Sequence, residues 1–367
     1  MGSFEEIFSR GCDPRGKNAQ HDFVEILFIA LLAQLCGAES CVDMADFARS
    51  KREVLGEVLD LRYGTPSHDT FSRVFRRLDP VAFGAGFRRF TEAFADKLGV
   101  GLRVGEVVAI DGKAVRGAYE HGRKTTPLHL VNVWATGARL AIAQTTAPGR
   151  NEVAGVLDAL ALLDLGGCFV TADALHCRAD VAQAILDAGA HYVLALKGNH
   201  PRLLKDANER CATTRGSRAA SQPETGHGRV ETRHACVVRV RDMAQKHGIP
   251  GLSAVARVTA TRAVAGQAAT TSTRLFLLSK PVPASRLLRI VRQHWHIENR
   301  LHWVLDVALG EDRARNRKDN GPENLAILRK IALNLLHTHP ETISSRRKIK
   351  RAGWDNHFLI SLLANMR

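Results

Sequence analysis

Several features that would place this 367-residue chain in a membrane or outside a cell are missing from its sequence. The longest apolar run in the N-terminal third, residues 26–33, is far shorter than the ~20 residues that a bilayer span requires. Glu5 and Glu6 make the first ten residues acidic where a secretory signal would be basic, so we expect no export signal. These absences argue against the membrane, extracellular and fibrous classes and predict a cytoplasmic protein.

Cysteine motifs are absent as well. The seven cysteines form no C-x-x-C pair, and their number is odd. This pattern argues against zinc knuckles and against a disulfide framework, and it fits a reducing compartment.

Negative charge is scarce compared with positive charge. The 52 Lys and Arg outnumber the 37 Asp and Glu, which gives a formal charge of +15. A balance this basic predicts a polyanionic partner, which for a chain of this class is nucleic acid. The length allows two or three domains, and 45% hydrophobic residues suffice for a sizeable core.

The first hundred residues predict a helical domain. Residues 23–35 are apolar on most sides and are followed by Gly37, which is typical of a buried helix with a glycine cap. Ser67 is an expected N-cap for a helix that runs to Leu78 and carries three arginines. Two interpretations of this basic helix stay open, contact with DNA or a solvated face of a helical bundle. The arginines are Arg73, Arg76 and Arg77.

Beyond residue 100 the periodicity predicts strands in the order β-β-β-α-β-α-β. This is the order of a ribonuclease-H-like core, a mixed α/β sheet flanked by helices. A stretch rich in Val, Thr and Arg then predicts a β-rich insertion, after which helical spacing returns. The expected domains are 1–100 (helical), 101–202 with 282–345 (core), 203–281 (insertion) and 346–367 (basic tail).

Three acidic residues are candidate metal ligands. Asp111 and Asp173 each lie immediately beyond the C-terminal end of an apolar strand, where ligands gather in a mixed α/β sheet, and the two strands are expected to be neighbours. Glu298, on the helix after the insertion, is the expected third ligand for Mg²⁺. Two alternatives stay open: Asp111-Gly is also a common turn pair, and Asp306 is a rival for the third position.

These residues lie in motifs that resemble those of the insertion-sequence DDE transposases, and most closely the bacterial H-repeat-associated subgroup. The three catalytic blocks of that family are similar to residues 107–117 (VVAIDGKAVRG), 170–177 (VTADALHC) and 294–307 (HWHIENRLHWVLDV). Further similarities cover nearly the whole chain, at residues 13–15, 66–71, 151–152, 192–199 and 227–233.

The resemblance implies a function for each element. It implies a ribonuclease-H-like fold, a β-strand insertion before the catalytic Glu298, and cutting and joining of transposon ends. Asp111, Asp173 and Glu298 would hold two Mg²⁺ ions, for which Mn²⁺ would substitute. The partner would be double-stranded DNA bound by a homodimer at the bacterial nucleoid.

Cations near the carboxylates are candidate phosphate contacts. Lys113, Arg116 and Lys197 follow strands that carry or neighbour the acidic residues. The resemblance adds Asn199 and Arg229, and also His294, which stands where related transposases place an arginine.

Two alternative functions are weighed against transposition. One is a nuclease on the same fold that cuts without strand transfer, and the other is a DNA-binding relic that catalyses nothing. Zinc bound by His294, His296 and His302 is disfavoured because no cysteine pair accompanies them. Nucleophilic catalysis by Cys177 is disfavoured because no activating base pattern is present.

Overall fold

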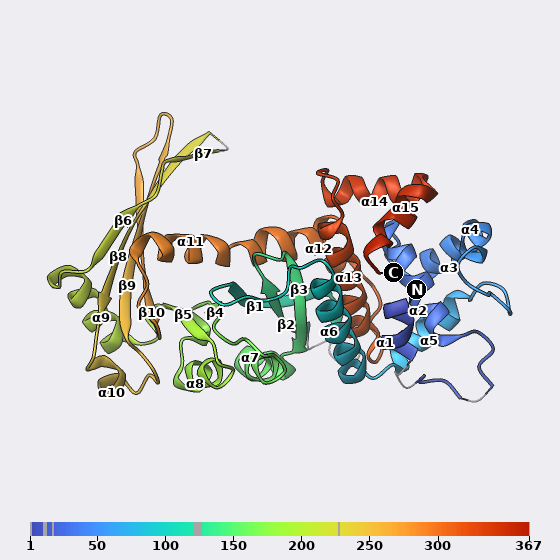
Figure 1. Ribbon diagram of the computed structural model, residues 1–367, viewed down its shortest axis with the longest axis horizontal. Coiled ribbons are helices and arrows are strands. Elements are labelled where there is room, and N and C mark those ends of the chain that lie inside the picture. Colours follow the sequence, from blue (N-terminus) through green and yellow to red (C-terminus); the bar gives the residue numbers. More distant parts are fainter. Residues whose placement is uncertain (1, 10–12, 17, 120–126, 227, 367) are drawn as a thin grey trace. The chain divides into compact units, whose positions relative to one another are not determined.

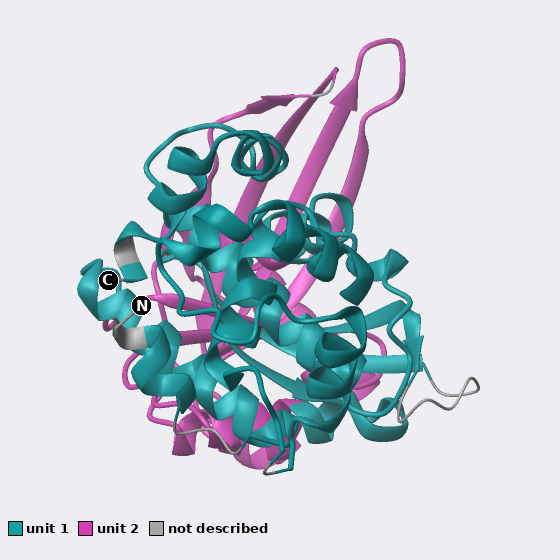
Figure 2. Ribbon diagram, turned by 90° about the vertical axis from the view of Figure 1, so that its right-hand side faces the viewer, with its two compact units in different colours: residues 1–101, 112–155, 298–367 teal, residues 102–111, 156–297 magenta. Residues whose placement is uncertain are grey.

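The computed structural model describes residues 2–9, 13–16, 18–119, 127–226 and 228–366. The chain divides into two compact units, each treated by itself below (Figure 2). Unit 1 comprises residues 1–101, 112–155 and 298–367, and unit 2 comprises residues 102–111 and 156–297. The chain therefore passes between the units directly after Asp111 and directly before Glu298. The domain limits expected from the sequence stay a prediction.

Helices fill the N-terminal part of unit 1, as the sequence predicts (Figure 1). Helix α2 (Phe23–Leu35) is buried over nearly its whole circumference and ends before Gly37, whose φ is +94°. Helix α5 (His68–Arg77) begins where the Ser67 hydroxyl accepts a hydrogen bond from the Thr70 N–H, which confirms the predicted cap. The other helices here are α1 (Gly2–Ser9), α3 (Cys41–Ser50), α4 (Arg52–Gly56) and α6 (Pro80–Lys97).

The strands form one mixed sheet in the order β3-β2-β1-β4-β5-β10-β9-β8-β6. Its first half has the element order β1-β2-β3-α7-β4-α8-β5 and the strand order 3-2-1-4-5. These are the orders of a ribonuclease-H-like core, so the predicted fold class is confirmed. The elements are β1 (Val107–Tyr119), β2 (Pro127–Ala135), β3 (Leu140–Thr146), α7 (Glu152–Ala161), β4 (Phe169–Ala172), α8 (Ala179–Asp187) and β5 (His191–Leu196).

Strand β4 is central to the core of unit 2. It pairs in parallel with the start of β1 on one side and with β5 on the other. All four of its residues are buried, as expected for a parallel strand covered on both faces.

The insertion extends the same sheet. Strand β10 (Thr270–Leu278) pairs antiparallel with β5, with Leu275 opposite Leu196 and Leu278 opposite Val193. The buried halves of β8, β9 and β10 pack with helix α11 (Ala284–His294) in one apolar cluster. The remaining elements are α9 (Pro201–Thr213), β6 (Ser217–Ala220), β7 (Glu224–Gly226), β8 (Arg229–Arg239), α10 (Met243–His247) and β9 (Ala254–Val264).

The C-terminal segment of unit 1 is helical to near its end. Helix α13 (Gly321–Thr338) is buried along almost its whole length. Residues expected as a basic tail form α14 (Ser345–Trp354) and α15 (Asn356–Leu362). The ammonium of Lys348 is buried and donates to the Leu336 carbonyl at 2.7 Å, so part of this basic run faces inward.

Helices α2 and α13 are therefore buried in the core of unit 1. Among the residues that the structure describes, we find no helix with the length and apolar character needed to cross a membrane.

Candidate active site

Asp111 and Asp173 occupy matching positions on neighbouring strands of unit 2. The last paired residues of β1 and β4 are Ala109 and Thr171, and each aspartate follows its strand's paired residue by two positions. Equal intervals along two parallel neighbouring strands place the backbone of both aspartates at the same carboxyl edge of the sheet, Asp111 within β1 and Asp173 directly after β4.

Asp111 lies within a strand and not beyond its end, which corrects the sequence-based expectation. The apolar run stops at Ile110, but β1 continues to Tyr119 because its backbone keeps pairing with β2. The interpretation of Asp111-Gly112 as a turn is therefore wrong. A Cβ at position 112 would lie 2.5 Å from the carboxyl carbon of Glu152, so a side chain here would displace the Glu152 carboxylate.

Asp173 directly follows β4 and caps the short helix Ala174–His176. Its Oδ1 accepts a hydrogen bond from the Leu175 N–H at 2.8 Å and lies 3.9 Å from Nε2 of His176. The side chain is still 46% exposed. One carboxylate oxygen is thus held by the backbone while the group stays accessible to an ion.

Glu298 lies in a π-helical turn, Ile297–His302, that follows α11 in the chain and precedes α12 (Trp303–Val307). Its Oε2 is 3.5 Å from Nδ1 of His302, and Nε2 of His302 is 3.2 Å from the amide nitrogen of Asn132 on β2. The Glu298 side chain is half exposed, so a carboxylate held by a buried histidine still faces solvent. π-turns are rare and concentrate at functional sites. The helical spacing that returns after the insertion is therefore not one continuous α-helix but is interrupted here.

Lys113 lies inside a group of carboxylates in unit 1. Its Nζ is 2.7 Å from Oδ1 of Asp306 and 2.8 Å from Oε2 of Glu311, and its side chain is 8% exposed. Burial alone would lower the pKa of Lys113, but the two carboxylates outweigh burial and raise it. This environment favours an internal ion pair over the expected phosphate contact, which stays an untested prediction. The same lysine forms an ion pair with Asp306, the rival candidate for the third metal ligand.

The other predicted DNA contacts are more accessible. Lys197 and Asn199 are exposed after β5, and Nδ2 of Asn199 donates to the Ala174 carbonyl, next to Asp173. Arg116 is 85% exposed, with Nε 3.5 Å from Asp312. The remaining two are partly buried, Arg229 at the start of β8 and His294 at the end of α11.

Cys177 is not an activated nucleophile. The residue is fully buried, and burial raises the pKa of its thiol to about 12. A thiol with so high a pKa is almost entirely protonated at neutral pH and therefore a poor nucleophile.

Both interpretations of the basic helix α5 stay open, contact with DNA or a solvated face of the helical domain. Arg73 and Arg77 are exposed, whereas Nε of Arg76 is 2.7 Å from Oδ2 of Asp319. One of the three arginines is thus used within unit 1.

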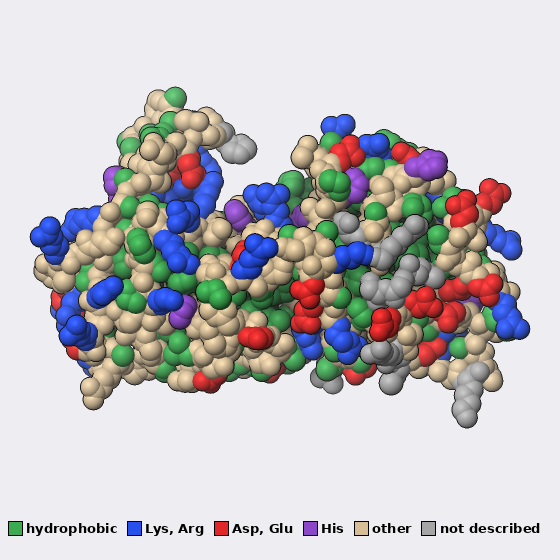
Figure 3. All heavy atoms as spheres, viewed as in Figure 1, with side chains coloured by type: hydrophobic (Ala, Val, Ile, Leu, Met, Phe, Trp, Pro, Cys, Tyr) green, Lys and Arg blue, Asp and Glu red, His purple; other side chains and the backbone are tan. Residues whose placement is uncertain are grey.

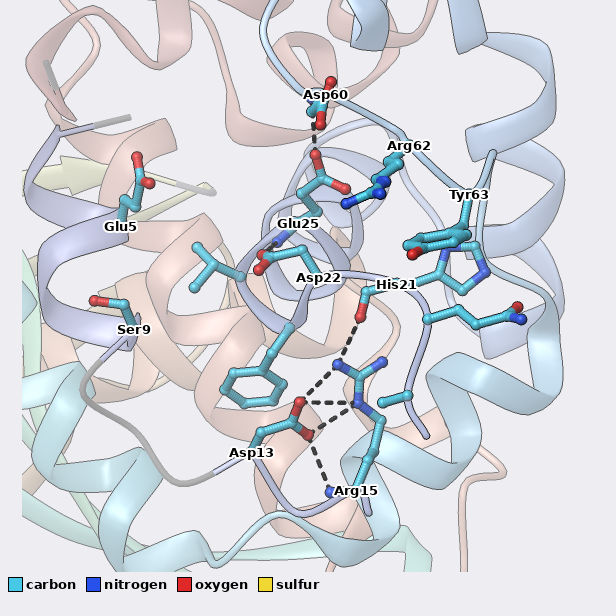
Figure 4. A pocket seen from close by; sticks show the side chains of 14 residues that line it. Glu5, Ser9, Asp13, Arg15, His21, Asp22, Glu25, Asp60, Arg62 and Tyr63 are labelled. Atoms are coloured by element: carbon cyan, nitrogen blue, oxygen red, sulfur yellow. Dashed lines mark hydrogen bonds and ion pairs between the residues drawn. The ribbon is translucent and has the colours of Figure 1, made fainter. Parts of the chain in front are cut away.

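A cavity of about 640 Å³ in the N-terminal helices contains none of the predicted site residues (Figure 4). Asp13 and Arg15 form a bidentate pair at its wall, and Glu25 accepts from the Asp60 N–H. Acidic side chains also gather over these helices on the face shown in Figure 3. The acidic lining makes this cavity a poor phosphate site.

Sequence reasoning missed several residues that surround the predicted ones. Glu152 was noted only as part of a motif, and its carboxylate packs on Gly112 with Oε1 3.5 Å from Nδ1 of His129. Glu311 belongs to a dense group of acidic residues at 306–312 in a basic chain. The local pattern does not predict that Glu311 and Lys330 are fully buried charges.

Comparisons with known proteins give the family. A family profile described as "Transposase DDE domain" matches residues 103–335, and one described as "DDE_Tnp_1-associated" matches residues 5–91. The chain is 31% identical to the "H repeat-associated putative transposase YhhI" of Escherichia coli, over 94% of this chain and 93% of the relative. It is 38% identical to the "Uncharacterized protein in dhlA 3'region" of Xanthobacter autotrophicus, over 70% of this chain and 87% of the relative.

A solved structure shows a weaker similarity. The piggyBac transposase in a synaptic complex with hairpin DNA has a TM-score of 0.42 and 12% identity, covering 99% of this chain and 77% of that one. The match of the DDE domain profile to more than half of the residues and the full-length relatives agree with the resemblance in the motifs. This chain belongs to the DDE transposase family.

Proposed function

We propose that this protein cuts DNA at transposon ends and joins those ends to target DNA, with Asp111, Asp173 and Glu298 as the catalytic carboxylates. The observation that carries the proposal is that Asp111 and Asp173 each stand two residues after the last paired residue of two parallel neighbouring strands, in a chain of this family.

The three side chains fit a divalent ion of the Mg²⁺ type. All three donors are carboxylate oxygens, which Mg²⁺ prefers, and Asp173 and Glu298 are about half exposed. When bound, two Mg²⁺ ions would activate a water molecule and stabilise the leaving oxygen of a phosphodiester, and Mn²⁺ would substitute for them.

The chain's own residues have distinct tasks in this proposal. The Leu175 N–H fixes one oxygen of Asp173, and His302 orients Glu298. Cleavage and joining are both in-line displacements at phosphorus, so one set of carboxylates serves both, and no covalent protein–DNA intermediate is needed.

DNA would be held by cations around the carboxylates. We assign phosphate contacts to Lys197, Asn199 and Arg116, which are exposed, and to His294 and Arg229. Lys113 is a weaker candidate because its ammonium is engaged by carboxylates. Two transposon ends require two active sites, so we expect a homodimer on DNA, acting on bacterial chromosomal DNA.

The test is Mg²⁺-dependent cleavage of DNA that carries the flanking repeats of the element. Wild type is expected to cleave and to form joined products, and Asp173→Asn is expected to lose cleavage by at least about a hundredfold while still binding DNA. Asp158→Asn, an exposed aspartate of α7, makes the same charge change and should behave as wild type.

The products also decide between the alternatives. Nicks or breaks without joined products would favour a nuclease. Tight binding with no cleavage under Mg²⁺ or Mn²⁺ would refute catalysis and favour a DNA-binding relic.

A further inference from the structure

Three carboxylates of unit 1 surround one ammonium group. Nζ of Lys113, on β1, lies 2.7 Å from Asp306 on α12, and 2.8 Å and 3.4 Å from Glu311 and Asp312 in the short helix Glu311–Arg313. Three anionic groups around one position are the arrangement expected of a cation site. In this protein the ammonium group of Lys113 takes the position of that cation.

The centre of this group is buried, although Asp306 and Asp312 are partly exposed, and its cations and carboxylates are equal in number. Glu311 and Lys330 are 0% exposed and Arg329 is 2% exposed. Burial disfavours an ionised Glu311, but Lys330 and Lys113 outweigh it and lower its pKa to about 2. Lys330 also donates to Oε1 of Gln144 at 2.7 Å. Three cations thus face the three anions, and removal of one leaves an uncompensated buried charge.

The backbone of β1 also contacts the segment that follows the short helix Glu311–Arg313. A Cβ on Gly117 would lie 2.4 Å from the Ala314 carbonyl oxygen, so the segment after the short helix lies directly against β1. The Arg116 N–H donates to Oδ1 of Asp312 at 3.2 Å, and Nε of Arg317 donates to the Gly117 carbonyl at 2.8 Å. The second half of β1 is therefore fastened to residues 312–317.

Lys113 and Asp306 each lie close in sequence to a proposed catalytic carboxylate. Lys113 follows Asp111 by two residues on one strand, and Asp306 follows Glu298 by eight residues along the π-turn and α12. The His302 contact holds the π-turn to β2, and the Asp306 contact holds the next turn to β1. The segment that carries Glu298 is thus fixed at two points within unit 1.

We propose that Lys113 is a positioning residue, a built-in cation that fixes the Glu298-bearing segment 298–307 to strand β1. This inference rests on the proposed function, because a fixed Glu298 matters for metal binding and cleavage. It assigns Lys113 a role inside the protein in place of a contact with DNA.

The test measures the order of the segment without relying on cleavage. The Lys113→Met variant keeps the length of the side chain and removes its charge. Hydrogen exchange followed by mass spectrometry measures the amide exchange rate of peptides that cover residues 298–307 in this variant. We expect amide exchange in this segment to rise at least about tenfold, with β8 and β9 unchanged. Lys205→Met, an exposed lysine of α9, is the matched control and should exchange as wild type.

A second variant covers the case in which Lys113→Met does not fold. Lys113→Met/Glu311→Gln removes one charge of each sign, so the buried balance is kept while Asp306 loses its partner. Fast exchange of 298–307 in this folded variant supports the proposal. Wild-type exchange in either folded variant overturns it.

Cleavage kinetics separate this role from a phosphate contact and from the proposed function. A positioning residue predicts a lower kcat for the double variant with KM for DNA within about threefold of wild type. Unchanged kcat with weaker DNA binding would instead make Lys113 a phosphate contact and overturn the proposal. Absence of cleavage by wild type would refute the proposed function, whereas the exchange result would stand.

Discussion

The hydroxyl of Thr171 and Nδ1 of His294 lie 3.0 Å apart, and this hydrogen bond joins β4 to the last residue of α11. Both residues belong to unit 2, and Thr171 precedes Asp173 by two positions. The bond fixes the plane of the imidazole ring. A ring that binds phosphate needs such an orientation, because hydrogen bonds to phosphate are directional.

Thr171→Val tests this relationship, because it removes the hydroxyl and keeps the shape of the side chain. We expect DNA affinity to fall by about threefold to tenfold, measured by fluorescence anisotropy, and the free energy of unfolding to fall by about 1 kcal/mol. Thr213→Val, at the exposed end of α9, is the control. Unchanged affinity in Thr171→Val would remove His294 from the list of phosphate contacts.

Gly112→Ala tests the packing behind Asp111. The added Cβ would lie 2.5 Å from the Glu152 carboxyl carbon, so one of the two must move. We expect a loss of about 1 kcal/mol in the free energy of unfolding by urea, at the low end of the cost of overpacking because the end of the Glu152 side chain can move. Cleavage should be slower because Gly112 adjoins Asp111. Glu152→Ala in the same chain should restore part of the stability.

A matched glycine shows whether the effect is local. Among the residues that the structure describes, apart from the two chain neighbours of Gly198, no atom lies within 4 Å of a Cβ at this position, so Gly198→Ala should cost little stability. Equal losses at both positions would contradict a specific role for the Gly112–Glu152 contact.

Glu323 predicts a pH dependence of stability. Burial, reinforced by the nearby Asp79 carboxylate, raises the pKa of Glu323 to about 7 from 4.5. Between these values the folded state keeps a proton that the unfolded state releases, so this group lowers stability as pH rises from 4.5 to 7. Glu323→Gln should therefore gain roughly 1–3 kcal/mol at pH 8 and nearly nothing at pH 4.5.

Urea unfolding at pH 4.5 and pH 8 measures this difference. Glu57→Gln, an exposed glutamate, should change stability by the same small amount at both pH values. A gain for Glu323→Gln that is equal at both pH values would contradict the assignment.

Cys177 should not react in the folded protein. Because burial raises the pKa of its thiol to about 12, alkylation by iodoacetamide at pH 8 should be at least about a hundredfold slower than for a free thiol. Cys177→Ala should cleave DNA at a rate within a fewfold of wild type. Fast labelling of Cys177, located by peptide mass spectrometry, would show an accessible thiol that the structure lacks.

Regular elements were predictable where local pattern and tertiary structure agree. The stretch rich in Val, Thr and Arg does form strands, among them β9, and α2 ends where the apolar run and Gly37 indicate. The Ser67 cap needs only its own hydroxyl and a nearby N–H, so it is readable from sequence. The matching of Asp111 with Asp173 follows from the parallel order of two buried strands.

Other features depend on contacts between distant segments. The extent of β1 beyond Ile110 is set by its partner strand, and the burial of Lys113 is set by carboxylates about 200 positions away. The residues expected as a basic tail are helical, and Lys348 there finds buried partners in the Leu336 and His339 carbonyls. Local periodicity carries no information on such partners.

The pairing of β10 with β5 determines whether the insertion can be separated from the core sheet. Four residues of β10, from Leu275 to Leu278, complete the hydrogen bonding of β5 in the core sheet. A strand left without this neighbour would expose an apolar edge that favours aggregation. The insertion therefore cannot be excised or exchanged as an independent cassette at residues 203–281, and any transplant between relatives must carry β10 together with the strand that it completes.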